Sequence, residues 1–267
     1  MSLYSKQDKL KKLILKYRSC LIAFSGGVDS AFLLKVAATL LPKESLLAVT
    51  ATSPTYPEEE LIYAKKIAKL VGARHKIIRT DEVKDKKFIS NPTQRCYYCK
   101  KELFSKLKTI ARRNKLKYVL DASNCSDKAD FRPGNRAKKE MGVRSPLVEV
   151  GFTKDDIRKM SKRLWLPTAD KPSLACLASR IPYGTEISSR ILERINKGEV
   201  FLRKLGFNQV RLRHYNGLCR IEVDKNDVPL LIAKRKALVD KLKKLGYNYI
   251  TVDLEGYRTG SLNEVIR

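Results

Sequence analysis

A short apolar run that stops at two adjacent glycines constrains this chain more than any other feature. Four apolar residues precede Ser25, Gly26 and Gly27 follow it, and an apolar pattern typical of a helix resumes after Ser30. A buried parallel strand that leads through a glycine turn into a helix N-terminus forms an anion site, because backbone N–H groups point at the ligand. We therefore expect a phosphate-binding loop here, with the two serines as additional hydroxyl donors.

The residues of this loop distinguish between nucleotide-binding families. No Gly-Lys-Ser or Gly-Lys-Thr follows, so it is not a Walker loop, and no Gly-x-Gly-x-x-Gly dinucleotide motif is present. The hexapeptide Ser-Gly-Gly-Val-Asp-Ser resembles the pyrophosphate loop of the ATP pyrophosphatases, which split ATP into AMP and pyrophosphate. The resemblance implies ATP and Mg²⁺ as cofactors, with Asp29 as a metal ligand, a helix cap or both. The loop residues expected to bind ATP are Ser25, Gly26, Gly27, Asp29 and Ser30.

Strand-like and helix-like segments alternate up to about residue 165. The expected strands are 20–24, 46–51, 74–78 and 117–121, with a fifth core element near 144–148. Such alternation implies right-handed crossovers and an α/β fold with a doubly wound parallel sheet. Trp165 is expected to be a core residue at the end of a helix.

The pattern changes after about residue 180. A helix, a hairpin, a second helix and a last strand are expected at 188–205, 209–223, 226–245 and 247–252. The turn Asn216-Gly217 is a strong hairpin signal. We therefore expect an ATP pyrophosphatase domain over residues 1–180. A smaller α+β domain over residues 181–267 would bind substrate or mediate oligomerisation.

The composition favours a cytoplasmic enzyme. No run approaches the roughly 20 apolar residues of a membrane span, and the N-terminus has no signal-peptide pattern. Six cysteines in such a chain are expected to be thiols, metal ligands or catalytic groups rather than a disulfide framework.

The net charge of +28, from 56 basic and 28 acidic residues, has two interpretations. Lysine-rich surfaces bind nucleic acid non-specifically. The lysines are spread along the whole chain, however, and no aromatic RNA-binding signature accompanies them. We therefore favour solvated helix faces, with nucleotide and pyrophosphate anions steered inward, and we do not expect nucleic acid as a partner.

Three cysteines stand apart by their context. Cys96 and Cys99 form a C-x-x-C pair at the start of an expected helix, and Cys176 lies in a loop rich in Pro, Ser and Gly. The pair alone fits a redox couple, half a metal site or chance. Soft thiolates select iron–sulfur clusters or zinc, and structural zinc normally takes four ligands. The alternative is an exposed pair with an unrelated loop thiol, whereas Cys20, Cys125 and Cys219 are not expected to be ligands.

Beyond the phosphate loop, the chain resembles the LarE family of ATP-dependent sulfur transferases nearly end to end. This family makes the thiocarboxylates of the nickel-pincer nucleotide cofactor of lactate racemase. The matching segments are 25–30, 95–100, Asn124 with Asp127 and Asp130, 132–134, 144–147, 175–180, Arg211 with Arg213, and 220–222.

The family as known has two chemistries. In one, the loop cysteine at the position of Cys176 gives up its own sulfur and becomes dehydroalanine, and members of this class lack the C-x-x-C pair. In the other, three cysteines hold a [4Fe-4S] cluster whose remaining iron carries an extra sulfide. With Cys96, Cys99 and Cys176 present, the chain resembles the cluster type, and sacrifice of Cys176 is the alternative.

The resemblance and the spacing imply further site residues. Asn124 and Asp127 would lie at the ATP site, and Arg180, next to Cys176, would act with Asp29 and Cys176 in catalysis by binding a substrate phosphate or carboxylate. Their plain alternative is a solvated turn or a surface ion pair.

Two more pairs come from the C-terminal part. Arg211 and Arg213 share one face of a strand, because side chains alternate with period two, and would bind a mononucleotide phosphate. Glu199 and Glu222 match family positions that contact a second metal ion, and a surface ion pair is the alternative for each.

Together these features imply an enzyme that adenylates the carboxylates of pyridinium-3,5-biscarboxylic acid mononucleotide and converts them to thiocarboxylates with cluster-carried sulfide. The expected substrate is this small mononucleotide, the sulfide donor is unknown, and analogy with the family suggests a homo-oligomer. A tRNA thiolase is the rival function, and a non-catalytic nucleotide or iron–sulfur module is a third reading that the intact loop and Cys176 oppose.

Overall fold

The computed structural model divides the chain into two units, and each is considered by itself. Residues 2–126, 133–172 and 175–266 are described. The first unit comprises Met1–Glu82 and Gln94–Leu174, and the second comprises Val83–Thr93 and Ala175–Arg267.

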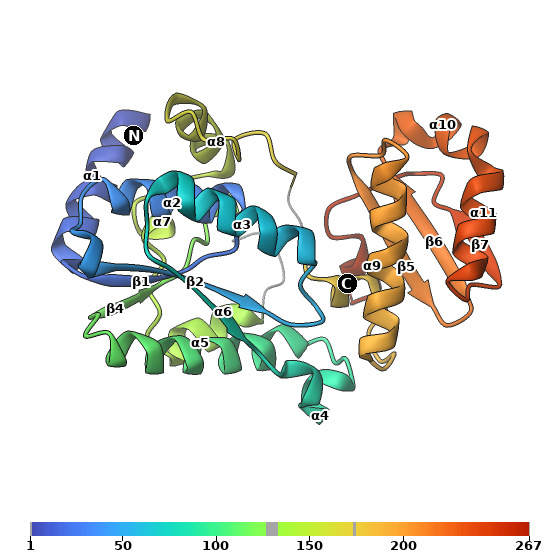
Figure 1. Cartoon of the computed structure of the whole chain (residues 1–267), viewed down its shortest axis with the longest axis horizontal. Coiled ribbons are helices and arrows are strands. Elements are labelled where there is room, and N and C mark those ends of the chain that lie inside the picture. The colour runs from blue at the N-terminus through green and yellow to red at the C-terminus, as the bar shows by residue number, and fades with distance from the viewer. Residues whose placement is uncertain (1, 127–132, 173–174, 267) are drawn as a thin grey trace. The chain divides into compact units, whose positions relative to one another are not determined.

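Four parallel strands form the centre of the first unit, in the order β3-β2-β1-β4 (Figure 1). Their bounds are β1 Cys20–Ala23, β2 Leu46–Thr52, β3 His75–Arg79 and β4 Tyr118–Leu120. Strand β1 pairs with β2 on one side and with β4 on the other, in both cases parallel. Because β1 is a central strand, its carboxyl end opens at the middle of the sheet edge, where ligands bind in open α/β sheets.

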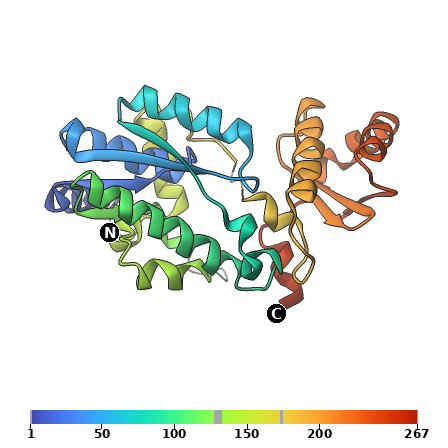
Figure 2. The ribbon, with the colours of Figure 1, turned by 60° about the horizontal axis from the view of Figure 1, so that its bottom comes forward.

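Helices cover both faces of this sheet (Figures 1 and 2). On β1, Cys20 and Ile22 join one apolar cluster, whereas Leu21 joins another on the opposite face. The first cluster contains residues of α1 Leu3–Tyr17, α2 Val28–Ala38, α3 Glu58–Val71 and α8 Lys154–Arg163. The second contains residues of α5 Arg95–Arg113 and α6 Gly134–Glu140. The doubly wound α/β fold is confirmed.

Two expectations for the first unit need correction. The segment near residues 144–148 adds one parallel bridge between Leu120 and Arg144 and then forms helix α7, Pro146–Glu149, instead of a full strand. Trp165 is 91% exposed, so its assignment to the core was wrong.

Trp165 ends helix α8 in a left-handed conformation with φ 53°. Its N–H donates to the Lys162 carbonyl at 3.0 Å, and the Leu166 N–H donates to the Ser161 carbonyl at 2.9 Å. This is the Schellman arrangement, in which the residue after the left-handed one packs against the helix. Leu166, only 5% exposed, therefore takes the core position.

The second unit contains a three-stranded sheet in the order β5-β6-β7. Strands β5 Val210–Tyr215 and β6 Leu218–Val223 form the expected antiparallel hairpin, and β7 Tyr249–Val252 pairs parallel with β6. Helix α9, Ser189–Lys204, packs on β5. The helix expected over 226–245 divides at Lys234 into α10, Val228–Ala233, and α11, Arg235–Lys244.

A short segment before helix α5 also belongs to the second unit. It contains helix α4, Lys86–Ile89, and the fully buried Asn91. The Asn91 side-chain amide donates to the carbonyls of Pro182 at 2.7 Å and Thr185 at 2.9 Å. Such contacts place residues 83–93 with the C-terminal part, which begins at Ala175 rather than at residue 181. Among the described residues no helix is long and apolar enough to cross a bilayer.

We expect Asn91→Ala to lower the free energy of unfolding of the second unit by about 2–4 kcal/mol, because it leaves buried carbonyls without donors. Asn91 has φ 54°, so alanine also strains the backbone. Asn216→Ala is the matched control, since Asn216 has φ 51° but is exposed at the hairpin. Denaturant unfolding measures both variants, and equal losses would contradict the assigned role of the Asn91 amide.

Candidate functional site

The phosphate loop connects β1 to α2 and has room only for glycine at position 26. Gly26 has φ +68°, and a Cβ there would lie 2.8 Å from the Ala64 Cα of helix α3. Gly27 is the N-cap of α2, in an extended conformation. The loop therefore passes close to α3 and presents backbone N–H groups at the N-terminus of an 11-residue helix.

The two serines of the loop form hydrogen bonds within it. The Ser30 hydroxyl accepts from the Ser25 N–H at 3.3 Å and donates to the Gly27 carbonyl at 3.2 Å. The two hydroxyl oxygens lie 3.1 Å apart. Ser30 is buried, whereas Ser25 is exposed. Ser30 thus fixes the loop, and Ser25 is the serine that a ligand can reach.

Asp29 joins the loop to two other segments. Its carboxylate lies 2.5 Å from the Lys154 Nζ and accepts from the Asn124 side-chain amide at 3.3 Å. Asn124 follows β4 and is 1% exposed. Its side-chain oxygen Oδ1 accepts from the Ser126 N–H at 2.9 Å. The structure thus brings together the expected ATP-binding residues of the loop and Asn124. Asp127, Asp130 and Arg132 lie outside the described residues.

Lys154 is a site residue that the sequence reasoning missed. It is the first residue of α8, whose capping box is formed by Thr153 and Asp156. A helix N-terminus disfavours cations because the backbone N–H dipoles point outward there. A lysine at this position, instead of the acids that follow it, was the signal for an anion-binding role.

Of the six cysteines, Cys20 and Cys219 are buried and Cys125 is half-buried. Burial raises the pKa of the Cys20 and Cys219 thiols to about 12, so both stay protonated within strands. The Cys125 thiol donates to the Val148 carbonyl at 3.7 Å. That none of these three cysteines is a ligand stays a prediction.

The other three cysteines are accessible. Cys96 is exposed and Cys99 half-buried, three residues apart on one face of α5. Cys176 is exposed and precedes the short 3₁₀ turn Leu177–Arg180 in the second unit. No group of three or more Cys, His, Asp or Glu side chains in the described parts of the chain is arranged to hold a metal ion. Cysteine sulfur is nevertheless the ligand type that iron–sulfur clusters take, so the residue types fit such a group.

Buried ion pairs dominate the second unit. The Arg180 guanidinium binds both carboxylate oxygens of Glu199, at 2.8 and 3.0 Å, and each side chain is 1% exposed. Arg213 binds both oxygens of Glu222, at 2.7 and 2.9 Å. Burial alone would raise the pKa of Glu199, but Arg180 and further donors hold it below its usual value. In this structure the two glutamates expected to contact metal are thus the partners of arginines.

Arg211 lies beside this network. Its side chain is 4% exposed and donates to the carbonyl of the preceding residue, Val210, at 2.8 Å. The guanidinium lies over the Tyr257 ring, 5.0 Å from the ring centroid. Burial, with the nearby Arg180 cation, lowers the pKa of Arg211 to about 10. The arginines 180, 211 and 213 are thus buried with two glutamates, which leaves an excess of positive charge that suits an anionic ligand.

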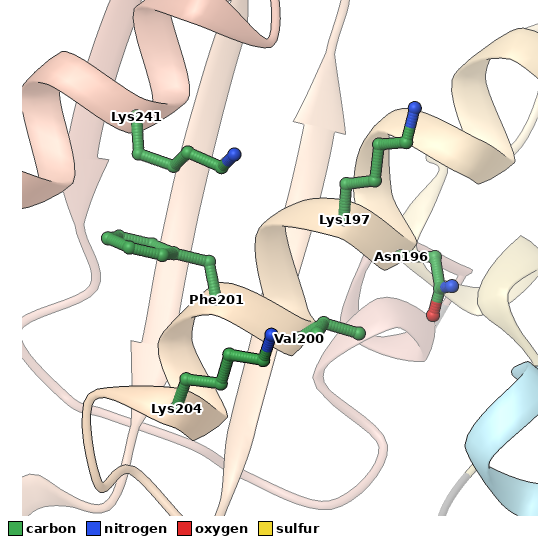
Figure 3. A pocket seen from close by; sticks show the side chains of 6 residues that line it. All are labelled: Asn196, Lys197, Val200, Phe201, Lys204 and Lys241. Carbon is green, nitrogen blue, oxygen red and sulfur yellow. The ribbon is translucent and has the colours of Figure 1, made fainter.

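A surface hollow of about 290 Å³ in the second unit does not involve these residues (Figure 3). It lies between α9 and α11 and is lined by Asn196, Lys197, Val200, Phe201, Lys204 and Lys241. Glu199 belongs to the same helix but is buried with Arg180. The phosphate loop in the first unit and the arginine network in the second are therefore two separate candidate sites, each considered by itself.

Comparison with known proteins identifies the family of the chain. The asparagine synthase family model matches residues 11–92, which contain the phosphate loop. The chain is 41% identical to an uncharacterized protein of Synechocystis sp., over 99% of both chains. It is 33% identical to the pyridinium-3,5-bisthiocarboxylic acid mononucleotide synthase of Lactiplantibacillus plantarum, over 99% of this chain and 96% of the relative. The chain therefore belongs to the LarE family of PP-loop enzymes, which use ATP.

Proposed function

We propose that this protein is an ATP-dependent sulfur transferase that converts the carboxylates of pyridinium-3,5-biscarboxylic acid mononucleotide into thiocarboxylates. The observation that carries the proposal is the phosphate loop with its Asp29–Lys154 pair, 2.5 Å apart, next to the carboxyl end of β1. The name of the Lactiplantibacillus plantarum relative, a synthase of the bisthiocarboxylic product, supports the choice of substrate.

The first step of the proposed reaction is adenylation. A carboxylate oxygen of the substrate attacks the α-phosphorus of ATP, and the bond from this phosphorus to the bridging oxygen breaks, which releases pyrophosphate. The loop N–H groups and Lys154 stabilise the charge that develops on the leaving pyrophosphate. Lys154 and Asp29 are 26% and 23% exposed, so ligand can reach both. When ATP binds, Lys154 would turn to the phosphates, and Asp29 would hold Mg²⁺.

The second step replaces AMP by sulfur. A free carboxylate resists nucleophiles, whereas a mixed anhydride with AMP has a good leaving group. Cys96, Cys99 and Cys176 would hold a [4Fe-4S] cluster, which supplies sulfide when bound. Sulfur adds to the acyl carbon, the bond to the AMP oxygen breaks, and a thiocarboxylate remains. Two rounds give the dithio product.

The arginines of the second unit would hold the substrate phosphate. Arg180 and Arg213 each bind a glutamate with two hydrogen bonds. We assign phosphate binding to Arg211 and Arg213, which lie two residues apart on β5, with Arg180 nearby. A second metal ion at Glu199 and Glu222 would require each carboxylate to exchange its arginine partner.

The first test concerns ATP cleavage. We expect Lys154→Ala to lower kcat/KM for ATP by about 100- to 1,000-fold, because one charged donor to the leaving pyrophosphate is lost. Lys162→Ala is the control, since Lys162 lies on the same helix in an exposed pair with Asp170. Chromatography of the nucleotides should show AMP and pyrophosphate. ADP and inorganic phosphate as products would refute the pyrophosphatase assignment.

The second test concerns the acceptor. We expect Arg211→Ala to weaken binding of the substrate mononucleotide by about 10- to 100-fold, the loss of a charged hydrogen bond. ATP binding should be unchanged, because Arg211 belongs to the other unit. Arg235→Ala serves as the control, since Arg235 is exposed on α11. Calorimetry measures the affinities for the mononucleotide and for ATP. Salt-sensitive binding of tRNA, with thiolated tRNA as the product, would favour the rival function.

The third test concerns the thiols. Alanine at Cys96, Cys99 or Cys176 should abolish the iron–sulfur absorbance of anaerobically prepared protein, because two thiolates do not hold a cubane cluster securely. Cys125→Ala should retain it. Intact mass after turnover should show that Cys176 keeps its sulfur. Dehydroalanine at position 176 in cluster-free protein that still forms product would establish the sacrificial route instead.

A further inference from the structure

The carbonyl of Ser25 is held by a residue from outside the phosphate loop. The Tyr56 hydroxyl donates to this carbonyl oxygen at 2.8 Å. In a planar trans peptide the C=O of one residue and the N–H of the next point in opposite directions. Fixing the Ser25 carbonyl therefore fixes the direction of the Gly26 N–H. Within the described residues this N–H donates to no protein acceptor, so it is available to an anion.

Tyr56 is in turn held by the turn that follows β2. Its N–H donates to the Ser53 carbonyl at 3.0 Å. The Ser53 and Thr55 hydroxyls both donate to one carboxylate oxygen of Glu82, at 2.5 and 2.9 Å. Glu82 lies shortly after β3, the neighbour of β2 in the sheet. Glu82 is thus connected to the phosphate loop through the turn residues Ser53 and Tyr56, by hydrogen bonds at each end of the turn and within it.

Stability alone does not explain a carboxylate at this position. Glu82 is 3% exposed, and no ion pair to it is present among the described side chains. Its second oxygen, Oε2, is buried without a hydrogen-bond partner. Burying an acid with hydroxyl donors on one oxygen only is unfavourable compared with a smaller apolar or amide side chain.

We propose that Glu82 and Tyr56 are positioning residues of the phosphate loop. Glu82 holds the turn at Ser53 and Thr55, Tyr56 holds the Ser25 carbonyl, and the Gly26 N–H is thereby aimed at the leaving pyrophosphate. The inference rests on the proposed function in one respect, namely that this loop binds the pyrophosphate part of ATP.

Binding of inorganic pyrophosphate to the full-length protein, measured by calorimetry, tests this chain of contacts. We expect Tyr56→Phe to weaken binding by about 10-fold and Glu82→Gln by about 3- to 10-fold, the range for one hydrogen bond. The double variant should bind no more than about 2-fold weaker than Tyr56→Phe, because both residues act through the same hydroxyl. Tyr63→Phe is the matched control, since the Tyr63 hydroxyl donates to the Pro167 carbonyl at 3.2 Å in the same unit.

The outcomes separate this inference from the function on which it rests. If wild-type protein binds pyrophosphate and Tyr56→Phe binds it as well as Tyr63→Phe does, the positioning role is refuted and the loop assignment stands. Losses that multiply in the double variant refute the coupling. If the wild type binds no pyrophosphate, both the positioning role and the proposed function are refuted. Thr55→Ala keeps the acid and removes one donor, so it should weaken binding even if Glu82→Gln fails to fold.

Discussion

The close approach of the phosphate loop to helix α3 is the constraint on which the site depends. Gly26 combines a positive φ with a hypothetical Cβ position 2.8 Å from the Ala64 Cα, so any other residue would displace either the loop or the helix. The sheet and α3 are packed through the same apolar cluster as α2. The loop is therefore fixed by core packing on one side.

The ion pairs of the two units differ in how far they are buried. The Asp29–Lys154 pair is partly exposed, so separating its members costs little. The Arg180–Glu199 pair is almost fully buried, and removing one member of such a pair costs about 3–5 kcal/mol. Breaking the Arg180–Glu199 pair would therefore leave an uncompensated buried charge in the second unit.

Three parts of the fold could be predicted because each depends on a local sequence pattern. Strand β1, helix α2 and the hairpin at Asn216-Gly217 follow from apolar runs and turn residues that are adjacent in the chain. Trp165 could not be placed in this way, because a large apolar side chain suggests burial whereas the left-handed helix end turns it outward. The membership of residues 83–93 in the second unit was equally inaccessible, since Asn91 bonds to carbonyls about 90 residues away.

The sequence by itself determined the fold class, the phosphate loop and the family, because these depend on the order of residue types along short segments. Tertiary structure decided which charged and polar side chains pair with one another. It placed Lys154 against Asp29, each glutamate against an arginine, and Glu82 beneath the turn that carries Tyr56. These pairs join residues far apart in the chain, and a hydrogen bond requires placement within a few tenths of an ångström, which only the packing of whole elements provides.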